Sequence, residues 1–343
     1  MKERQSNIEV LRIVCMIAIV LSHFFGQSNF RGDRNLILLL FSSGSRIATN
    51  IYIIISCWFF QESRVTNRYN KIFGIWFTML FYNLLGTAIV FFCGNCLSIT
   101  ELISAVLPFS RKNPWFGSAY ICLLLFHPFL QKAVEIPQKQ LARLCIVLFI
   151  CIPLLSMFSK RMDTFLDQLC WFVSCYFFVG YYKRYLVDRL HVLPVFSALF
   201  GILVYFCLVF LKGYGQGHFR TLAASYLLDM KTLPNFLCSI CLFHSFIKIN
   251  SQSNKIINRI SMLTFPLYCF HQAANFYPFI WNDVFLANKW ENKMVYAYAI
   301  GMVTVMFVFV GIIEPIRRYL MEHLMKSRII EKMNNKINTL LSD

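Results

Sequence analysis

Charge is scarce in this chain. Asp, Glu, Lys and Arg make up only 14% of its 343 residues, whereas a soluble globular domain usually carries about 25%. Apolar residues make up 58%. A soluble fold of this length could not bury so much apolar surface, because its own surface must be solvated. The composition excludes a soluble globular protein and predicts an integral membrane protein.

The sequence also lacks the motifs of several enzyme classes. It has no phosphate-cradling glycine loop, no zinc-binding helix motif and no nucleophile elbow. Its 13 cysteines are too scattered for a disulfide scaffold, and neither Cys93-x-x-Cys96 nor Cys238-x-x-Cys241 has a second pair or nearby histidines in the usual metal pattern. We expect no metal site and no tightly bound cofactor. A local disulfide between Cys93 and Cys96 is the alternative to two incidental thiols.

Acidic residues are few, 16 against 33 Lys and Arg, which gives a formal net charge of +17. Such a basic balance can indicate nucleic-acid binding. Here, however, the basic residues lie between apolar runs rather than in one patch. That pattern is typical of topology determinants and of contacts with anionic lipid headgroups. We therefore expect membrane lipids as partners, and no nucleic acid.

Apolar runs of about 20 residues can cross the roughly 30 Å hydrocarbon core of a bilayer as helices. Ten segments approach this length: 8–25, 36–60, 72–93, 115–131, 144–159, 169–182, 194–211, 233–247, 262–281 and 294–314. The first has no small-residue cleavage site and is followed by further spans, so it is interpreted as a retained helix. The predicted fold class is all-α, a polytopic membrane helical bundle with about ten transmembrane helices.

The orientation follows from the distribution of Lys and Arg. With the N-terminus inside, the inner segments carry 20 of these residues and the outer segments 11, which predicts that both termini are cytoplasmic. We divide the chain into a membrane-spanning domain, residues 1–316, and a cytoplasmic tail, residues 317–343. The tail alternates charge with Leu, Met and Ile, so it is either an amphipathic helix on the inner leaflet or a solvated terminus.

Ionisable side chains inside apolar segments are costly, by about 2.5 kcal/mol or more for a central arginine, and are functional candidates by default. Arg12 and His23 are eleven residues apart in the first segment. This spacing equals three helical turns plus about 20° and a rise of about 16 Å. The two side chains therefore share one helix face, with Arg12 toward the cytoplasm and His23 in the outer half.

A face of this kind suits a site that extends across the membrane. The imidazole of His23 suits a general base, and the Arg12 guanidinium suits a phosphate or carboxylate. Glu9 lies one turn before Arg12, in position to pair with it. The alternative is that Arg12 snorkels to the inner headgroups while His23 sits at the outer interface. The spacing alone does not decide between them.

Three other intramembrane groups have simpler interpretations. Glu314 lies just before two arginines, Arg317 and Arg318, and is predicted to form an ion pair with them. His127 and His244 lie near the inner ends of their segments and are predicted to be interfacial or hydrogen-bonded helix residues.

Other residues leave two interpretations open. Arg46, near the outer start of the second segment, either snorkels outward or lines a cavity. His271, in the middle of its segment, has either a structural or a functional role. The segment from Trp115 to Tyr120 carries aromatic residues at an expected outer interface. It is either an aromatic belt or a platform that stacks on a sugar ring.

Phrases in order along nearly the whole chain resemble the acyltransferase-3 family of bacterial membrane acyltransferases. The first segment resembles the opening helix of that family, in which an arginine is followed after ten residues by a histidine, as Arg12 is by His23. Residues 50–56 are similar to a second-span phrase that continues with glycine, where this chain has Cys57. The other similar positions are Arg68 with Lys71, Trp115 to Tyr120, Thr264 to His271, and Glu314.

The resemblance implies a multi-pass O-acyltransferase of the bacterial inner (plasma) membrane. Its expected reaction moves an acyl group, most commonly acetyl, from cytoplasmic acyl-CoA to a hydroxyl of a surface or lipid-linked polysaccharide. It implies that His23 and Arg12 are catalytic and that Arg68 and Lys71 bind acyl-CoA. The residues expected to bind the acceptor are Trp115, Tyr120 and His271, and those expected to support the site are Glu9, Arg46, Ser56 and Glu314.

Two other classes remain as alternatives. A membrane transporter or flippase of glycan-lipid intermediates would also carry intramembrane charges, although the sequence shows no inverted repeat and no paired broken spans. A glycan polymerase is expected to have a large outer loop with arginines, and the longest outer loops here have about twenty residues. Transfer of label from acetyl-CoA to glycan separates the enzyme from both.

Overall fold

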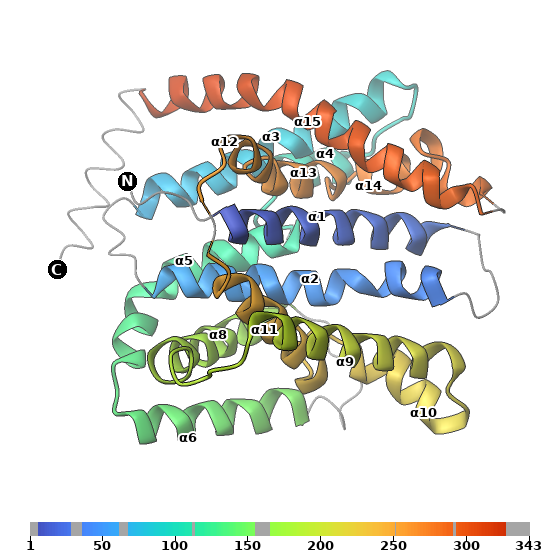
Figure 1. Cartoon of the computed structure of the whole chain (residues 1–343). Helices are drawn as coiled ribbons and strands as arrows, with labels where there is room; N and C mark the ends of the chain where they lie inside the picture. The colour runs from blue at the N-terminus through green and yellow to red at the C-terminus, as the bar shows by residue number, and fades with distance from the viewer. Residues whose placement is uncertain are drawn as a thin grey trace.

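The computed structural model describes residues 6–28, 36–61, 68–111, 114–154, 165–250, 252–290 and 293–326, and these residues form helices and turns without a strand. The long helices run roughly parallel to one axis (Figure 1). We call the end of the bundle at which the first helix begins and the last helix ends the terminal end, and the opposite end the far end. The helical architecture confirms the predicted all-α fold class.

Five helices are long and apolar enough to cross a membrane: α1 (Ser6–Gln27), α2 (Leu36–Phe60), α3 (Arg68–Phe92), α9 (Pro194–Tyr214) and α15 (Val295–Met325). The shorter α-helices are α4 (Ile99–Val106), α5 (Trp115–Val134), α6 (Gln138–Phe149), α8 (Phe165–Tyr181), α10 (Gly217–Leu222), α11 (Leu233–Ile247), α12 (Lys255–Ser261), α13 (Thr264–His271) and α14 (Phe276–Phe279). Single π-helical turns cover Ile150–Leu154, Tyr182–Leu186, Ala223–Leu227 and Ile280–Val284. About ten crossings and two cytoplasmic termini stay predictions.

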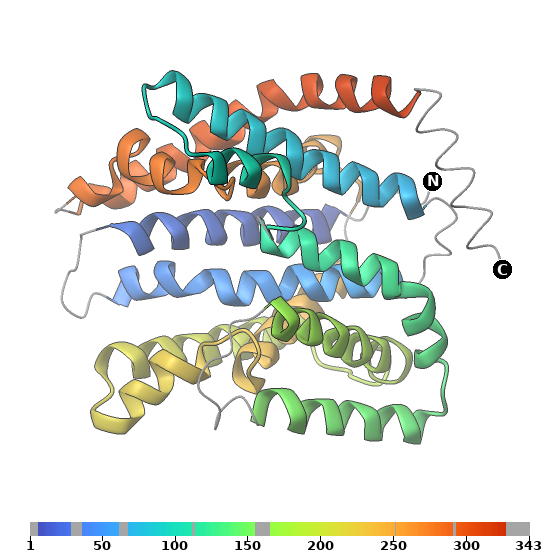
Figure 2. The same ribbon diagram turned by 180° about the vertical axis from the view of Figure 1, so that it is seen from behind.

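Helix α1 occupies the centre of the bundle. Helices α3, α13 and α15 lie on one side of it, and α2, followed by α8, α9 and α11, lies on the other (Figures 1 and 2). In the most apolar stretch of α1, 61% of residues are buried, against 22% in α9. The exposed face of α9 carries Leu199, Phe200 and Leu203, as expected for a helix that faces lipid. The helix that holds Arg12 and His23 is therefore shielded from lipid by its neighbours.

Hydrogen bonds fix α1 against α2 at two depths. Toward the far end, the Ser22 hydroxyl donates to the Ser42 carbonyl at 2.8 Å and lies 2.9 Å from the Ser45 hydroxyl. Toward the terminal end, the Tyr52 hydroxyl donates to the Arg12 carbonyl at 2.6 Å. The two helices run antiparallel, so these contacts set which residues of α1 and α2 lie at the same level.

The apolar segment 262–281 is not one continuous helix. Helix α13 ends at His271 and α14 begins at Phe276, so the single span predicted for residues 262–281 is wrong, and His271 ends a helix inside the bundle. The break is tolerated because α3 supplies partners for the freed groups. Asn83 accepts a hydrogen bond from the Ala274 amide at 3.2 Å, and Asn275 donates to the Thr87 hydroxyl at 3.1 Å.

Helix α5 begins in the middle of the bundle and runs to the terminal end (Figure 2). The Trp115–Tyr120 segment therefore lies inside the protein, and its predicted position at an outer interface is wrong. Aromatic packing holds it there: the Phe116 ring lies 5.8 Å from the Tyr268 ring and 5.2 Å from the Phe172 ring. The aromatic-belt interpretation does not apply to these residues.

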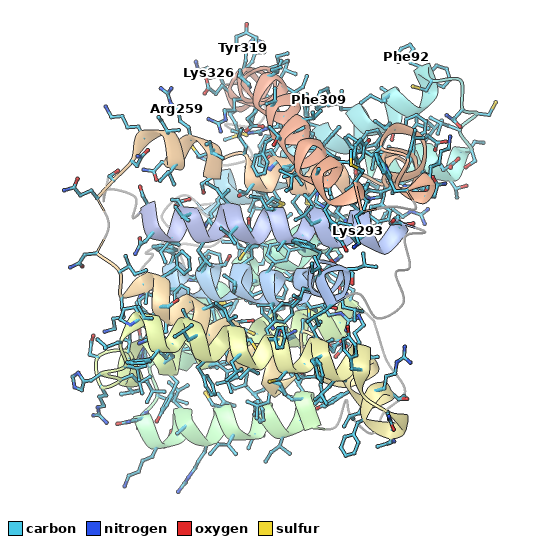
Figure 3. All side chains as sticks on the ribbon, turned by 45° about the vertical axis from the view of Figure 1, so that its right-hand side comes forward. Phe92, Arg259, Lys293, Phe309, Tyr319 and Lys326 are labelled. Atoms are coloured by element: carbon cyan, nitrogen blue, oxygen red, sulfur yellow. The ribbon has the colours of Figure 1, made fainter. Side chains whose placement is uncertain are left out.

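Helix α15 continues without interruption through the predicted domain boundary at residue 316 and ends at Met325. The tail from residue 327 onward lies outside the described residues. Basic side chains lie at both ends of the bundle: Arg259 and Lys326 toward the terminal end, and Lys293 toward the far end (Figure 3).

Cys93 and Cys96 are exposed free thiols, so the alternative of a disulfide between them is not realised.

Candidate active site

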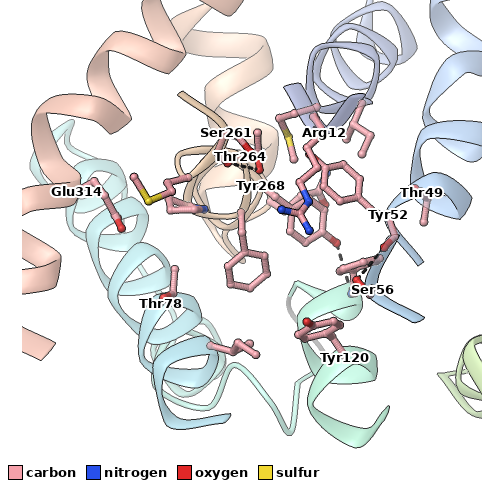
Figure 4. A pocket seen from close by; sticks show the side chains of 18 of the residues that line it. Arg12, Thr49, Tyr52, Ser56, Thr78, Tyr120, Ser261, Thr264, Tyr268 and Glu314 are labelled. Carbon is pink, nitrogen blue, oxygen red and sulfur yellow. Dashed lines mark hydrogen bonds between the residues drawn. The ribbon is translucent and has the colours of Figure 1, made fainter. Parts of the chain in front are cut away.

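A cavity of about 660 Å³ lies beside α1 and is walled by α2, α3, α5, α13 and α15. Its lining includes Lys71, Arg317 and Arg318 at the terminal end and His23 and Arg46 in the far half. Arg12 lies between these groups, and Figure 4 shows it reaching into the cavity from α1. The cavity therefore connects a cationic mouth with a histidine deep in the bundle.

One face of α1 supplies a full wall of this cavity. The lining residues are Glu9, Arg12, Met16, Ile19 and His23. Their spacings alternate between three and four, which is the repeat of a single helix face. The sequence prediction that Arg12 and His23 share a face is confirmed. The remaining faces of α1 carry apolar residues that pack against neighbouring helices.

Arg12 is held by Glu9, as predicted. Its Nη1 donates to Glu9 Oε1 at 2.7 Å, and the Ser261 hydroxyl donates to the other Glu9 oxygen. The Glu9 side chain is 5% exposed and that of Arg12 is 26% exposed. Arg12 therefore keeps part of its guanidinium open to the cavity, while the carboxylate that neutralises it is buried.

His23 is positioned by two partners that come from the broken segment. Its Nδ1 lies 3.1 Å from the Tyr277 hydroxyl, and its ring centroid lies 5.4 Å from that of His271. His271 is fully buried, does not line the cavity, and donates from Nδ1 to the Leu267 carbonyl at 2.7 Å. With Nδ1 of His23 engaged, its Nε2 is the nitrogen available to exchange a proton with a bound group.

A dense charge cluster forms the terminal mouth. Glu314 accepts two hydrogen bonds from Arg317, at 2.8 and 2.7 Å, and one from Arg318 at 2.9 Å. It also accepts one from the Tyr82 hydroxyl at 3.1 Å. The predicted ion pair of Glu314 is confirmed. Together with Lys71, the two arginines leave this mouth positively charged, as binding of a phosphate group requires.

Lys71 lies over two aromatic rings at this mouth. Its ammonium nitrogen is 4.6 Å from the centroid of the Phe60 ring and 5.7 Å from that of the Tyr120 ring. Trp115 and Tyr120 both line the cavity, with Tyr120 on the side of Lys71. Arg68 begins α3, but its side chain is outside the described part of the chain, so its predicted role stays a prediction.

The α2 wall is polar. Ser45, Arg46, Thr49, Tyr52 and Ser56 all line the cavity. The Ser56 hydroxyl donates to the Tyr52 carbonyl at 2.8 Å. Of the two alternatives for Arg46, the structure selects the cavity.

His127 and His244 are structural. The Nε2 of His127 donates to the Phe60 carbonyl at 2.9 Å, and Nδ1 of His244 bonds to the Tyr182 hydroxyl. Both lie outside the cavity, which confirms the sequence interpretation of hydrogen-bonded helix residues. Among the described residues, no group of three His, Cys, Asp or Glu side chains is arranged to hold a metal ion.

Sequence reasoning missed Tyr277, Arg317 and Arg318 as residues of the site. Pro278 follows Tyr277 and lies in the first turn of α14. A proline within an apolar segment is a cue that a new helix begins close by. The two arginines were assigned only to pairing with Glu314. Their contact with the cavity depends on where α15 packs, and local sequence does not encode that position.

One comparison with known proteins gives a match. A family model described as an acyltransferase domain matches residues 5–314, which is nearly the whole chain. No curated protein and no solved structure matches the chain.

Proposed function

The chain belongs to the acyltransferase-3 family, and from this premise we propose that it is a membrane O-acyltransferase that transfers an acetyl group from acetyl-CoA to a polysaccharide hydroxyl. Family membership makes it an acyltransferase of groups other than aminoacyl groups. The donor, the acyl group, the acceptor and the bacterial inner membrane as its location are our proposals.

One observation carries the proposal: a single cavity contains both the cationic mouth and His23. The donor and the acceptor glycan are expected on opposite faces of the membrane. An enzyme that joins them needs a protected path through the bilayer. Arg12 and His23 both line the cavity and are separated by about 16 Å along α1. The cavity therefore extends through about half of the roughly 30 Å thickness of the hydrocarbon core.

The terminal mouth is proposed to bind the phosphates of coenzyme A. Arg12, Lys71, Arg317 and Arg318 line it, and arginine matches phosphate oxygens through paired N–H donors. Arg68 is expected to add to this charge. We also propose that Tyr120, which lies beside Lys71, contacts the donor rather than the acceptor. Because the donor is expected in the cytoplasm, we propose that the terminal end of the bundle faces the cytoplasm.

The transfer step assigns the proton to His23. As an acceptor hydroxyl attacks the thioester carbonyl, His23 Nε2 takes its proton, and the Nδ1–H donates to the Tyr277 oxygen. The new ester C–O bond forms as the C–S bond breaks, and the proton passes to the thiolate, which leaves as free coenzyme A. Trp115 is proposed to stack against the acceptor, and His271 to hold the His23 ring from behind.

The main alternative is a transporter or flippase without acyl-transfer activity. A charged cavity in the membrane serves such a protein equally well. Family membership favours the enzyme, because the family model that matches the chain is described as an acyltransferase domain.

Transfer of label tests the proposal. Membranes from cells that express the protein are incubated with acetyl-CoA labelled in the acetyl group. We expect label in lipid-linked or polymeric glycan, and none when membranes lack the protein. Absence of label from all glycan fractions, with normal amounts of the protein, would contradict the proposal.

A further inference from the structure

Arg46 is an uncompensated cation in the far half of the cavity. It lies ten residues into α2, lines the cavity and is half-buried. Among the described residues, no carboxylate lies within 4 Å of its guanidinium, in contrast to Arg12 and Arg317. A charge inside a membrane bundle that has no oppositely charged partner is costly. A cavity that retains such an unpaired charge is expected to use it to bind a ligand.

A second cation lies close by. Lys212, near the far end of α9, donates from Nζ to the Ser43 hydroxyl at 3.0 Å. Ser43 and Arg46 are three residues apart on α2, so they lie on neighbouring positions of one helix face. Lys212 is close enough to Arg46 for their charges to repel. Among the described residues, Lys212 also has no carboxylate within 4 Å. An anion bound between the two cations would offset this repulsion.

This pair of cations lies at the level of His23. The hydroxyl groups of Ser22 and Ser45 are 2.9 Å apart, and these residues directly precede His23 and Arg46 in the chain. Both His23 and Arg46 line the cavity. A molecule that presents a hydroxyl to His23 therefore has Arg46 beside it, away from the cationic mouth at the other end.

We propose that Arg46, assisted by Lys212, binds an anionic oxygen group of the acceptor: a sugar carboxylate or a phosphate of its lipid carrier. This inference rests on the proposed function and names the acceptor as an acidic or phosphorylated glycan. The donor phosphates are proposed to lie at Arg12 and the cations beyond it toward the terminal end, and Arg12 is about 16 Å from His23 along α1, so the anion at Arg46 is a different group. Arg46 then selects the acceptor and orients its hydroxyl toward His23.

Ligand-dependent thermal stability of the purified, full-length protein in lipid nanodiscs tests the inference. Saturating coenzyme A occupies the donor site, and three probes are compared at equal ionic strength: glucuronate, pyrophosphate and neutral glucose. We expect glucuronate, pyrophosphate or both to raise the melting temperature, and glucose to leave it unchanged. The anion that acts identifies the source as a sugar carboxylate or a carrier phosphate.

Three variants assign the effect to the residue. Arg46→Gln should weaken binding of the active anion at least tenfold, and Arg46→Lys should retain part of it. Arg220→Gln removes an exposed charge of α10 and should bind the anion like wild type. Arg46→Gln without any ligand should melt at the same temperature as wild type or higher, because it removes an unpaired charge.

Three results would overturn the inference. The first is that neither anion stabilises the protein, and the second is that the stabilisation persists in Arg46→Gln. The third is a lower melting temperature of unliganded Arg46→Gln, which would mark Arg46 as structural. The proposed function fails differently: membranes with labelled acetyl-CoA would then transfer no label, whatever the anion-binding result.

Discussion

His23 is fixed by residues that lie far from it in the sequence. Tyr277 bonds its Nδ1 at 3.1 Å, and His271 packs against its ring. A histidine that acts as a base needs one nitrogen held and the other free. The sequence identified His23 and Arg12 because helical periodicity is local. Tyr277 was not identified, because its position depends on the break between α13 and α14.

Tyr277→Phe should slow acyl transfer while leaving donor binding intact. The change removes the hydroxyl that orients His23 and keeps the aromatic ring. Loss of a partner that orients a functional histidine typically costs roughly 10- to 100-fold. We expect kcat to fall by this amount, the KM for acetyl-CoA to stay unchanged, and the pH dependence of kcat to change. The measurement is steady-state transfer at several pH values.

Tyr298→Phe is the matched control, because Tyr298 packs against Phe24 and Trp290 and does not touch His23. It should retain wild-type kcat. Equal losses in the two variants, or an unchanged pH profile in Tyr277→Phe, would show that Tyr277 has only a packing role.

Glu314→Gln should destabilise the protein strongly. The buried carboxylate accepts three hydrogen bonds from Arg317 and Arg318 and one from Tyr82. Removing one member of a buried ion pair costs about 3–5 kcal/mol, since it leaves a buried charge without its partner. Thermal unfolding in detergent measures the change, with exposed Glu135→Gln as the control. A melting temperature equal to that of the control would contradict this account of the mouth.

At the scale of helices, α1 was the element best predicted from sequence. Its boundaries, its functional face and the Glu9–Arg12 pair all follow from positions within one helix. The start of α5 at Trp115 was predicted correctly, but its expected place at an outer interface was wrong. Segment 262–281 was predicted as one span and is broken, because apolar length does not distinguish a spanning helix from buried broken pieces. The partners that permit the break, such as Asn83 on α3, are distant in sequence.

Gly86→Ala should impair transfer by moving α14. A Cβ atom at Gly86 would lie 2.7 Å from the Phe276 Cβ, closer than real Cβ contacts allow. Helix α14 must then shift, and Tyr277, next to Phe276, shifts with it. We expect kcat to fall about tenfold or more, because misplacing a catalytic contact by about 1 Å can cost 100-fold.

Gly301→Ala provides the comparison for this change. Gly301 lies on the exposed face of α15, and its added Cβ would meet nothing within 4 Å. Transfer by this variant should equal that of wild type. If Gly86→Ala also retained wild-type kcat, the close contact between α3 and α14 would not position Tyr277.

For the whole molecule, composition sufficed to predict a helical membrane protein, because apolar excess leaves few other folds. Five helices meet the length and hydropathy expected of spans. The cavity itself could not be predicted, since it is the space left by at least five helices whose packing depends on contacts throughout the chain. All of the predicted site residues line it except His271 and Arg68, whose side chain lies outside the described part of the chain.

The proposed orientation predicts which face of the membrane exposes two native thiols. Cys93 and Cys96 are exposed after α3, at the opposite end of that helix from Lys71. A membrane-impermeant maleimide should therefore label them in intact spheroplasts, and the Cys93→Ser/Cys96→Ser double variant should lose that label. Labelling of these thiols only in inverted vesicles would reverse the orientation and move the cationic mouth away from cytoplasmic acyl-CoA.

The central claim is that acyl transfer takes place in the cavity at His23. Purified wild-type protein and His23→Ala, reconstituted with acetyl-labelled acetyl-CoA and glycan extracted from the producing cells, test it directly. The account predicts that wild type transfers label and that His23→Ala loses roughly 100-fold or more of the rate, while both bind coenzyme A equally. Transfer by His23→Ala at the wild-type rate, from equal amounts of folded protein, would contradict it.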